Sequence, residues 1–434
     1  MNLQIGELEK SPRRYDVDWL RVILFGLLIW FHYVVFSLVQ IEENDGNMRI
    51  VNSSLLIVIE VMHQWRLAAL FVISGMGTSF AFRRRTWKTY VAERGARLGI
   101  PLLFGTYILW LGIIDPIKTT ARLFTIFIGA DNIPYGHLWF IYNLLIYSFL
   151  LTPLFAHVRN NPEGKVVHFV RSVFRIRHGL GIMLIPPLIL AVNGILFKPW
   201  EFGEVGMWWE FPRYLLYFLF GYLMITAKDE YFQVIDQIRI PVTILMPILT
   251  ISWFLFSSLS GVPAVMEGGW VRDGHPAFSI DATIASLLQS FHAWFWCLFI
   301  FSWASKLLNR SSIWLTYLNE AIYPAYIVHL HLTFFSIAVF EIIGTGYYVG
   351  LTFGAIFVMV GVMICFEISR RARFVRPLFG INRGTNEVEK LFPYNQTENP
   401  SVRILFSILF HILSIGMTTG LLILLISASI LGAI

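Results

Sequence analysis

Two ionisable residues stand inside the first apolar stretch of this chain, RYDVDWLRVILFGLLIWFHYVVF. They are Arg21 and His32, which lie about 16 Å apart along the axis if the stretch is one helix. Ionisable side chains at membrane depth are costly, and they usually face a cavity or a partner. A histidine can take up and return a proton near neutral pH, because its unperturbed pKa is about 6.5. His32 is therefore a candidate general base, and Arg21 is a candidate ligand for a phosphate.

A second apolar stretch, IEVMHQWRLAALFVISG, carries three more such residues. It is expected to run antiparallel to the first, and counting residues from their shared outer end places Glu60 and His63 level with His32. Arg66 follows one turn deeper, on the same helical face as His63 through its i, i+3 spacing. Glu60 or His63 is thus positioned to orient the His32 ring, as a third group does in hydrolytic triads. We predict His32, Glu60 and His63 as the catalytic residues.

Histidines later in the chain allow two interpretations. His292, His329 and His331 are expected near mid-membrane, so that imidazoles from four helices converge at similar heights. Alternatively each buried histidine is hydrogen-bonded to a neighbour and only structural, the interpretation we prefer for His137, His331 and His411. Imidazoles with a carboxylate also suit zinc, but no pair has the i, i+4 spacing of a helical zinc motif, so no metal site is predicted.

A strongly basic segment, RRRTWKTYVAERGARLG, follows the second stretch. Within it, Arg94 and Arg97 share a helical face at the start of the next apolar run, where two guanidiniums can grip a phosphate from two sides. Basic residues beside a span also set topology and contact anionic lipid, which is the simpler explanation for the run as a whole. The pair nevertheless points to a nucleotide-like or diphosphate ligand.

The elements that must hold these residues are membrane-spanning helices. Hydrophobic residues make up 56% of the 434 residues and charged residues only 14%, which is typical of a membrane protein. A span needs about 20 apolar residues, and this template predicts an all-α, polytopic transmembrane helix bundle of about eleven helices. They are expected near residues 17–40, 54–81, 96–115, 137–157, 180–197, 211–227, 240–260, 281–305, 314–343, 347–369 and 403–432.

The connecting loops alternate in charge along the chain. The N-terminal segment and the loops after the second, fourth, eighth and tenth predicted helices are basic, while the loops between them carry few cations. The positive-inside rule then places the N terminus in the cytoplasm, in a multi-pass protein of the cell (inner) membrane. The formal net charge of +6 is therefore a topology signal, and no nucleic-acid partner is expected. Both cysteines fall in apolar runs, which excludes a disulfide framework.

The predicted domain organisation has three segments. Residues 1–380 form the main transmembrane domain, 381–402 a cytoplasmic linker loop, and 403–434 an additional C-terminal transmembrane helix. The chain shows no internal repeat and no inverted-half symmetry, features that are common in transporters. A proton-coupled transporter or flippase that uses the buried His and Glu residues is nevertheless the alternative function, and a non-catalytic membrane scaffold is a third.

Several motifs, in order along residues 14–330, resemble the acyltransferase-3 family of integral-membrane O-acyltransferases, closest to its glucan-biosynthesis branch. The family's first-helix motif, an Arg, ten residues and a His, is matched by Arg21 and His32. Its R-x-x-R motif falls on Arg94 and Arg97. The other matched motifs are HQWRLAALFVISG with His63 and Arg66, GHLWFIYNLLIY with His137, and AIYPAYIVH with Tyr323, Pro324, Tyr326 and His329.

The resemblance implies a ten-helix core, to which the eleventh helix is added. It implies transfer of an acyl group, acetyl or succinyl, from cytosolic acyl-CoA to a hydroxyl of a carbohydrate or lipid-linked acceptor in the envelope. In the family the first-helix His is taken as the catalytic residue, and the R-x-x-R pair is associated with the phosphates of the donor. Acyl-CoA is then a co-substrate, no tightly bound cofactor is expected, and membrane lipids are the remaining partners. Donor or substrate binding, including an oxyanion contact, is assigned to Arg21, Arg66, Arg94, Arg97, Tyr326 and His329.

Overall fold

The regular secondary structure of the described chain is helical. The computed structural model describes residues 14–42, 49–112, 114–127, 136–197, 210–261, 278–371, 375–381 and 399–405, with scattered positions between 408 and 427. Within these ranges the regular elements are α-helices, π-helices and 3-10 helices, and no strand occurs. The predicted all-α class is confirmed.

The elements follow one another with the bounds listed here. The first half consists of α1 (Tyr15–Glu42), α2 (Arg49–Phe82), α3 (Trp87–Arg94), the π-helix η1 (Gly95–Gly99), α4 (Ile100–Phe104), the π-helix η2 (Gly105–Leu109), α5 (Pro116–Phe127), the 3-10 helix η3 (Gly136–Leu138), α6 (Trp139–Leu150), α7 (Thr152–Asn160) and α8 (Lys165–Arg175). The second half consists of the 3-10 helix η4 (Arg177–Gly179), α9 (Leu180–Phe197), α10 (Glu210–Thr226), α11 (Lys228–Gln237), α12 (Arg239–Ser260), α13 (Ile280–Leu307), α14 (Ile313–Ile343), α15 (Tyr347–Arg371) and the 3-10 helix η5 (Arg376–Phe379).

Seven helices of the described chain are long and apolar enough to cross a membrane: α1, α2, α9, α12, α13, α14 and α15. The pair α6 and α7 makes an eighth if its two parts, bent by 48°, form one span. The bend coincides with Pro153, whose ring and missing N–H disfavour continuation of the preceding helix. The chain is thus a multi-pass membrane protein, as predicted.

Three further predicted helices are not confirmed as single spans. The one expected at 96–115 begins earlier, at Trp87, and alternates between α-helix and π-helix until Leu109. The one expected at 211–227 is α10, whose 17 residues are fewer than the roughly 20 that a straight span needs. The one expected at 403–432 lies largely outside the described residues. The count of eleven, the cytoplasmic N terminus and the three-segment organisation therefore stay predictions.

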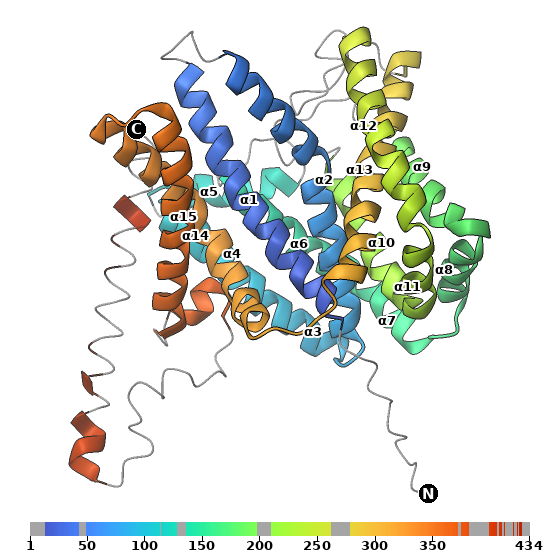
Figure 1. Ribbon diagram of the computed structural model, residues 1–434. Coiled ribbons are helices and arrows are strands. Elements are labelled where there is room, and N and C mark those ends of the chain that lie inside the picture. Colours follow the sequence, from blue (N-terminus) through green and yellow to red (C-terminus); the bar gives the residue numbers. More distant parts are fainter. Residues whose placement is uncertain are drawn as a thin grey trace, which may run out of the picture.

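The helices α1 and α2 lie side by side in the middle of the molecule (Figure 1). On one side α10 and α13 pack against α2, with α9 and α12 farther out. On the other side α14 packs against α1, and α15 covers α14. The start of α1, the end of α2 and the short helix α3 lie at the same end of the bundle.

The contact between α2 and α10 is a backbone contact made possible by glycine. A Cβ built on Gly75 would lie 1.9 Å from the carbonyl oxygen of Phe218, and one built on Gly221 would lie 1.9 Å from that of Val72. Any side chain at either position would force the helices apart. Small residues at helix crossings are the usual means by which membrane helices approach closely, because lipid offers no hydrophobic driving force between helices. This contact holds α2 in place.

The outermost helices expose apolar side chains. Only 22% of the most apolar window of α12 and 28% of that of α15 are buried inside the protein, compared with 67% for α2. Exposed side chains on α15 include Phe353, Ile356 and Val360. Such continuous apolar faces suit contact with lipid tails. The predicted site residues on α1, α2 and α14 lie instead on the central helices.

Candidate active site

The centre of the candidate site is a pair of imidazoles from two packed helices. His32 of α1 and His329 of α14 are joined by a hydrogen bond of 2.9 Å between His32 Nδ1 and His329 Nε2. Their rings stack with centroids 5.1 Å apart and an angle of 15° between planes. The Nδ1 atom of His329 lies 2.8 Å from the carbonyl oxygen of Tyr326, one turn earlier in the same helix. His329 is fully buried, whereas His32 is only half-buried.

A third histidine joins this pair, and it is one for which we preferred a structural role. The ring centroid of His137, in η3, lies 4.6 Å from that of His329 and 5.0 Å from that of Tyr326. The hydroxyl of Tyr326 donates a hydrogen bond to the carbonyl oxygen of His137. We call His32, His137 and His329 the imidazole cluster. Its signal in the sequence was the HLWF motif, which opens a helix that packs inside the bundle.

The predicted α2 residues reach the cluster through Phe31. The His63 ring stacks on that of Phe31, with centroids 5.7 Å apart, and the Arg66 Cζ atom lies 3.6 Å from the centre of the Phe31 ring. His63 and Arg66 therefore share a face of α2, as their spacing predicted. Glu60 lies one turn earlier on α2 and is half-buried.

Arg66 is a cation buried inside the helix bundle. Its side chain is 1% exposed, and two of its nitrogens, Nε and Nη1, have no hydrogen-bond partner in the described part of the chain. An aromatic face attracts a guanidinium, but it does not satisfy N–H donors. Because burying an unpaired charge is costly, these two donors favour a nearby acceptor or anionic group. His32, which follows Phe31 in the chain, has its ring centroid 5.7 Å from that of Phe31.

Of the other predicted histidines, one lies at the edge of the cluster and one packs elsewhere. His331 packs against Trp110, with ring centroids 4.8 Å apart, and lies at the edge of the cluster, 6.4 Å from His137. His292 of α13 does not join it, because its Nδ1 atom pairs with the hydroxyl of Thr250 at 3.1 Å. The convergence that we predicted from four helices thus uses His137 in place of His292. His411 lies outside the described residues.

A cavity of about 310 Å³ lies where the start of α1, the end of α2, α3 and η1 meet. We call it the arginine cavity, because four guanidiniums line it. Its lining residues are Asp18, Arg21, Ser74, Gly77, Ala81, Arg85, Tyr90, Glu93, Arg94, Arg97, Leu144, Asn319, Ile322 and Tyr323. The structure therefore brings Arg21 together with the R-x-x-R pair, although they are separated along the chain. The π-helix η1 carries Arg97, and π-helical turns are frequent at functional sites.

Two of the four cations in the arginine cavity have a carboxylate partner. Arg21 pairs with Asp18 at 3.4 Å, and Arg85 pairs with Glu93 at 2.5 Å. Arg94 donates instead to the hydroxyl of Thr78 at 2.9 Å.

Arg97 is the fourth of these cations. Its Cζ atom lies 5.1 Å from the centre of the Tyr323 ring. Within the described residues no carboxylate neutralises Arg94 or Arg97. The cavity therefore keeps an excess of positive charge, as a site for phosphate requires.

The helices α1 and α14 connect the arginine cavity with the imidazole cluster. Arg21 lines the cavity, and His32 follows it by about 16 Å along α1. On α14, Tyr323 lines the cavity and His329 follows about 9 Å farther along. The two predicted constellations thus lie on the same pair of packed helices, at different depths.

Gly77 determines how much room the Arg21 guanidinium has. A Cβ built on Gly77 would lie 2.8 Å from Arg21 Nη2, closer than real Cβ contacts allow. Any larger residue on this turn of α2 would therefore displace the guanidinium within the cavity. The sequence contains no signal for this, because Gly77 belongs to none of the matched motifs.

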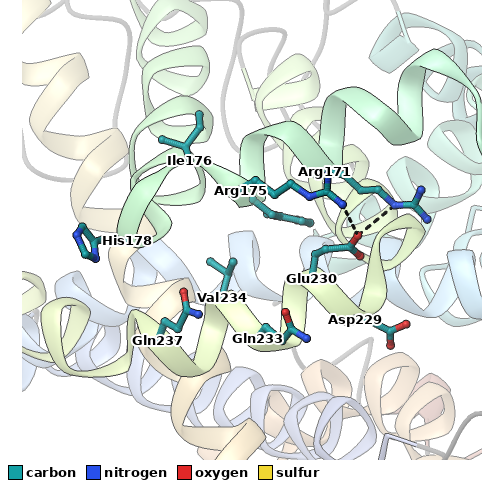
Figure 2. Close-up of a pocket in the computed structure, with 10 residues that line it drawn as sticks. Arg171, Arg175, Ile176, His178, Asp229, Glu230, Gln233, Val234 and Gln237 are labelled. Atoms are coloured by element: carbon teal, nitrogen blue, oxygen red, sulfur yellow. Dashed lines mark ion pairs between the residues drawn. The ribbon is translucent and has the colours of Figure 1, made fainter.

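A larger cavity, of about 560 Å³, lies between α8 and α11 (Figure 2). Glu230 is close to both of its arginines, 3.2 Å from Arg171 and 3.8 Å from Arg175. Arg171 also pairs with Glu163, and Asp229 lines the same cavity. The positive and negative charges balance, so we do not regard this cavity as the candidate site.

The structure gives no candidate metal centre. Among the described residues, no three His, Cys, Asp or Glu side chains are grouped so that they could hold a metal ion. Both cysteines, Cys297 and Cys365, are buried and free. Imidazoles and guanidiniums are the groups that the described structure brings together at the site.

Comparisons with known proteins agree with the geometry. A family model described as an acyltransferase domain (Acyl_transf_3) matches residues 14–367. Glucans biosynthesis protein C of Escherichia coli K12 is 25% identical over 387 residues, which cover 85% of this chain and 94% of that protein. The protein of the same name from Escherichia coli O157:H7 shows the same identity and coverage. No solved structure matches the chain significantly. The matched region contains both the imidazole cluster and the arginine cavity, and the chain belongs to the acyltransferase-3 family.

Proposed function

We propose that this protein is a membrane-bound O-acyltransferase that moves an acyl group from acyl-CoA to a hydroxyl of a glycan or another envelope acceptor. One observation carries the proposal: α1 and α14 each contribute a residue to the arginine cavity and a histidine to the imidazole cluster. A donor with a phosphorylated end and a reactive end fits such an arrangement. The family supplies the class of reaction.

The phosphates of coenzyme A bind in the arginine cavity in this proposal. Arg94 and Arg97 supply cations that no carboxylate of the described residues neutralises, and Arg21 adds a third guanidinium nearby. Planar guanidiniums bind phosphate oxygens in pairs, which suits a diphosphate. The pantetheine arm then runs between α1 and α14 toward the cluster. The basic loops support a cytosolic location for this end of the bundle, by the positive-inside rule, and an inner membrane is part of the proposal.

His32 acts as the general base at the other end of the donor. It takes the proton from the acceptor hydroxyl while the hydroxyl oxygen attacks the thioester carbonyl. The tetrahedral intermediate then collapses, the C–S bond breaks, and the thiolate of coenzyme A takes up the proton from His32. The products are an ester and free coenzyme A, so no external oxidant, reductant or metal is needed.

Arg66 provides the positive charge at the reacting end. Its Nε and Nη1 donors are buried and have no hydrogen-bond partner among the described residues, and they lie beside Phe31, next to His32. They suit the oxyanion of the tetrahedral intermediate. They equally suit the terminal carboxylate of a succinyl group, so that both acetyl and succinyl donors stay within the proposal. Glu60 and His63 lie on α2 together with Arg66, and in this proposal they help to orient the His32 ring of α1.

The acceptor is proposed from the relatives. The matched proteins are named for glucan biosynthesis, which favours a glucan hydroxyl in the envelope over a lipid or a small molecule. Mass spectrometry of envelope glycans from cells with and without this protein would identify both the acyl group and the acceptor. Unchanged glycans would direct the search to lipid-linked acceptors.

Replacing His32 with Ala tests the proposal directly. We expect acyl transfer from acyl-CoA to fall by about 10²–10⁴-fold, the usual contribution of a general base, while acyl-CoA binding stays within about twofold of wild type. His292→Asn is the control, because His292 is also a histidine of a packed helix, fully buried, but lies away from the cluster.

Normal acyl transfer by His32→Ala would exclude His32 as the base. Movement of the acceptor across vesicles in the absence of acyl-CoA would favour the transporter or flippase instead.

A further inference from the structure

The hydrogen bonds of the imidazole pair also determine which nitrogen of each ring carries the hydrogen. Each ring nitrogen of a neutral histidine either donates or accepts a hydrogen bond, never both. The described structure gives partners for three of the four ring nitrogens: His329 Nδ1 with the Tyr326 carbonyl, and His329 Nε2 with His32 Nδ1. A carbonyl oxygen can only accept, and this fixes the direction of the whole chain of bonds.

The direction follows in two steps. His329 Nδ1 must carry a hydrogen, because it faces the carbonyl oxygen of Tyr326 at 2.8 Å. The Nε2 atom of a neutral His329 is therefore the acceptor, and His32 Nδ1 must donate to it across 2.9 Å. The hydrogen of His32 then sits on Nδ1, and Nε2 of His32 is left with a free lone pair.

The opposite assignment is excluded by the same geometry. If His329 donated through Nε2, its Nδ1 would carry a lone pair that faces the oxygen lone pairs of Tyr326. His32 would then carry its hydrogen on Nε2, the nitrogen that a general base needs to have free. Histidine catalysts generally depend on a neighbour that selects the tautomer.

We propose that His329 is a positioning residue, which uses the backbone carbonyl of Tyr326 to hold His32 in the tautomer whose Nε2 is basic. The inference rests on the proposed function, in which His32 is the base. It replaces the substrate-binding role that we predicted for His329 from the sequence. It also gives the Tyr326 backbone a function that its side chain does not have.

The surroundings hold His329 in this orientation. Its ring is fully buried, stacks on His32 and meets His137 edge to face at 4.6 Å. The Tyr326 hydroxyl is bonded to the carbonyl of His137, which ties α14 to η3 at the same level. A ring enclosed on these sides cannot flip without disturbing several helices. The tautomer of His32 is thus set before the substrate arrives.

Three substitutions at position 329 separate positioning from simple structural support. Gln places an amide oxygen near the former Nε2 position, so it can still accept from His32 Nδ1–H. Asn places its amide near the former Nδ1 position, so it can bond to the Tyr326 carbonyl but not to His32. Ala makes neither contact.

We expect His329→Asn and His329→Ala to lower kcat by about 10²-fold or more, the scale on which general-base catalysis operates. His329→Gln should keep kcat within about tenfold of wild type. The KM for acyl-CoA should stay within about twofold in all three, because His329 touches no donor phosphate in the proposed function. Thermal unfolding of the purified proteins should show that the Gln and Asn variants are equally stable.

The outcomes distinguish this inference from the proposed function. Equal kcat for the Gln and Asn variants, or wild-type kcat for His329→Ala, would overturn the positioning role while His32→Ala remained inactive. Acyl transfer by His32→Ala would instead remove the proposed function itself. An Asn variant that lost kcat while the Gln variant kept it would support the inference.

Discussion

Two cavities in the described part of the chain are each lined by more than one arginine, and only one of them is a candidate site. In the larger one, between α8 and α11, Glu230 lies close to both Arg171 and Arg175, and Glu163 pairs with Arg171 as well. In the smaller arginine cavity, two of four guanidiniums have a carboxylate partner. Size alone would have selected the larger cavity, in which the charges balance.

The difference shows that the charges that no ion-pair partner neutralises matter more for anion binding than the total number of charges in a cavity. A guanidinium paired with a carboxylate is satisfied and binds an anion only by giving up that partner. Arg94 and Arg97, which contact a hydroxyl and an aromatic ring, give up no ion pair when a phosphate arrives. The position of the cavities strengthens the distinction, because only the arginine cavity shares α1 and α14 with the imidazole cluster.

The largest expected effect comes from removing the surplus cations. Arg94→Gln combined with Arg97→Gln should raise the KM for acyl-CoA by on the order of 10²-fold or more, because each hydrogen bond to a charged group contributes about 1.5–3 kcal/mol. Steady-state kinetics with purified protein would measure it.

The matched control is Arg171→Gln combined with Arg175→Gln in the other cavity, which should leave this KM within about threefold of wild type. A similar rise of KM in both double variants would show that the distinction between the two cavities does not hold.

A smaller effect is expected from Gly77→Ala. The added methyl group collides with Arg21 Nη2 and displaces that guanidinium, so the KM for acyl-CoA should rise by roughly tenfold, the equivalent of about 1.4 kcal/mol. Gly26→Ala on α1 is the control, because no atom lies within 4 Å of its added Cβ. An unchanged KM in Gly77→Ala would mean that Arg21 does not contact the donor.

The smallest effect concerns the pair beside the α8–α11 cavity. The hydrogen bond from Arg171 lowers the pKa of the Glu163 carboxyl below its ordinary value. This pair therefore stabilises the fold above the ordinary glutamate pKa of about 4.3, and that stability is lost as the pH falls through the lowered pKa.

Glu163→Gln tests that pair through the pH dependence of the unfolding temperature. The variant should unfold slightly below wild type at pH 7, and the two temperatures should converge in acid. Since Glu163 is exposed, the difference should be small, and acyl transfer should be unaffected. A gap that widened as the pH fell would contradict the sign of this effect.

Much of this protein was accessible from local features of its sequence. Runs of apolar residues marked the helices, and seven helices of the described residues are long and apolar enough to span a membrane. The i, i+3 spacing placed His63 and Arg66 on one face of α2, where both meet Phe31. The R-x-x-R pair was predicted to bind phosphate, which stays a prediction, and both arginines line one cavity. Periodicity suffices here because it depends only on neighbouring residues.

Other features depended on how distant helices pack. His32 and His329 are 297 positions apart, and no spacing rule relates them. His292 was expected level with the other imidazoles and His137 was not counted among them, whereas packing brings His137 against His329 and leaves His292 beside Thr250. Which carboxylate neutralises which arginine was equally hidden, because pairing depends on side chains brought from separate helices.

Composition and spacing therefore settled which segments become helices and which residue types they carry, since helix geometry repeats along any single segment. The tertiary structure alone decided which imidazoles touch and which cations stay unpaired. The reason is physical: a hydrogen bond or an ion pair extends only a few ångströms, so its existence depends on the packing of whole helices, which no local pattern encodes.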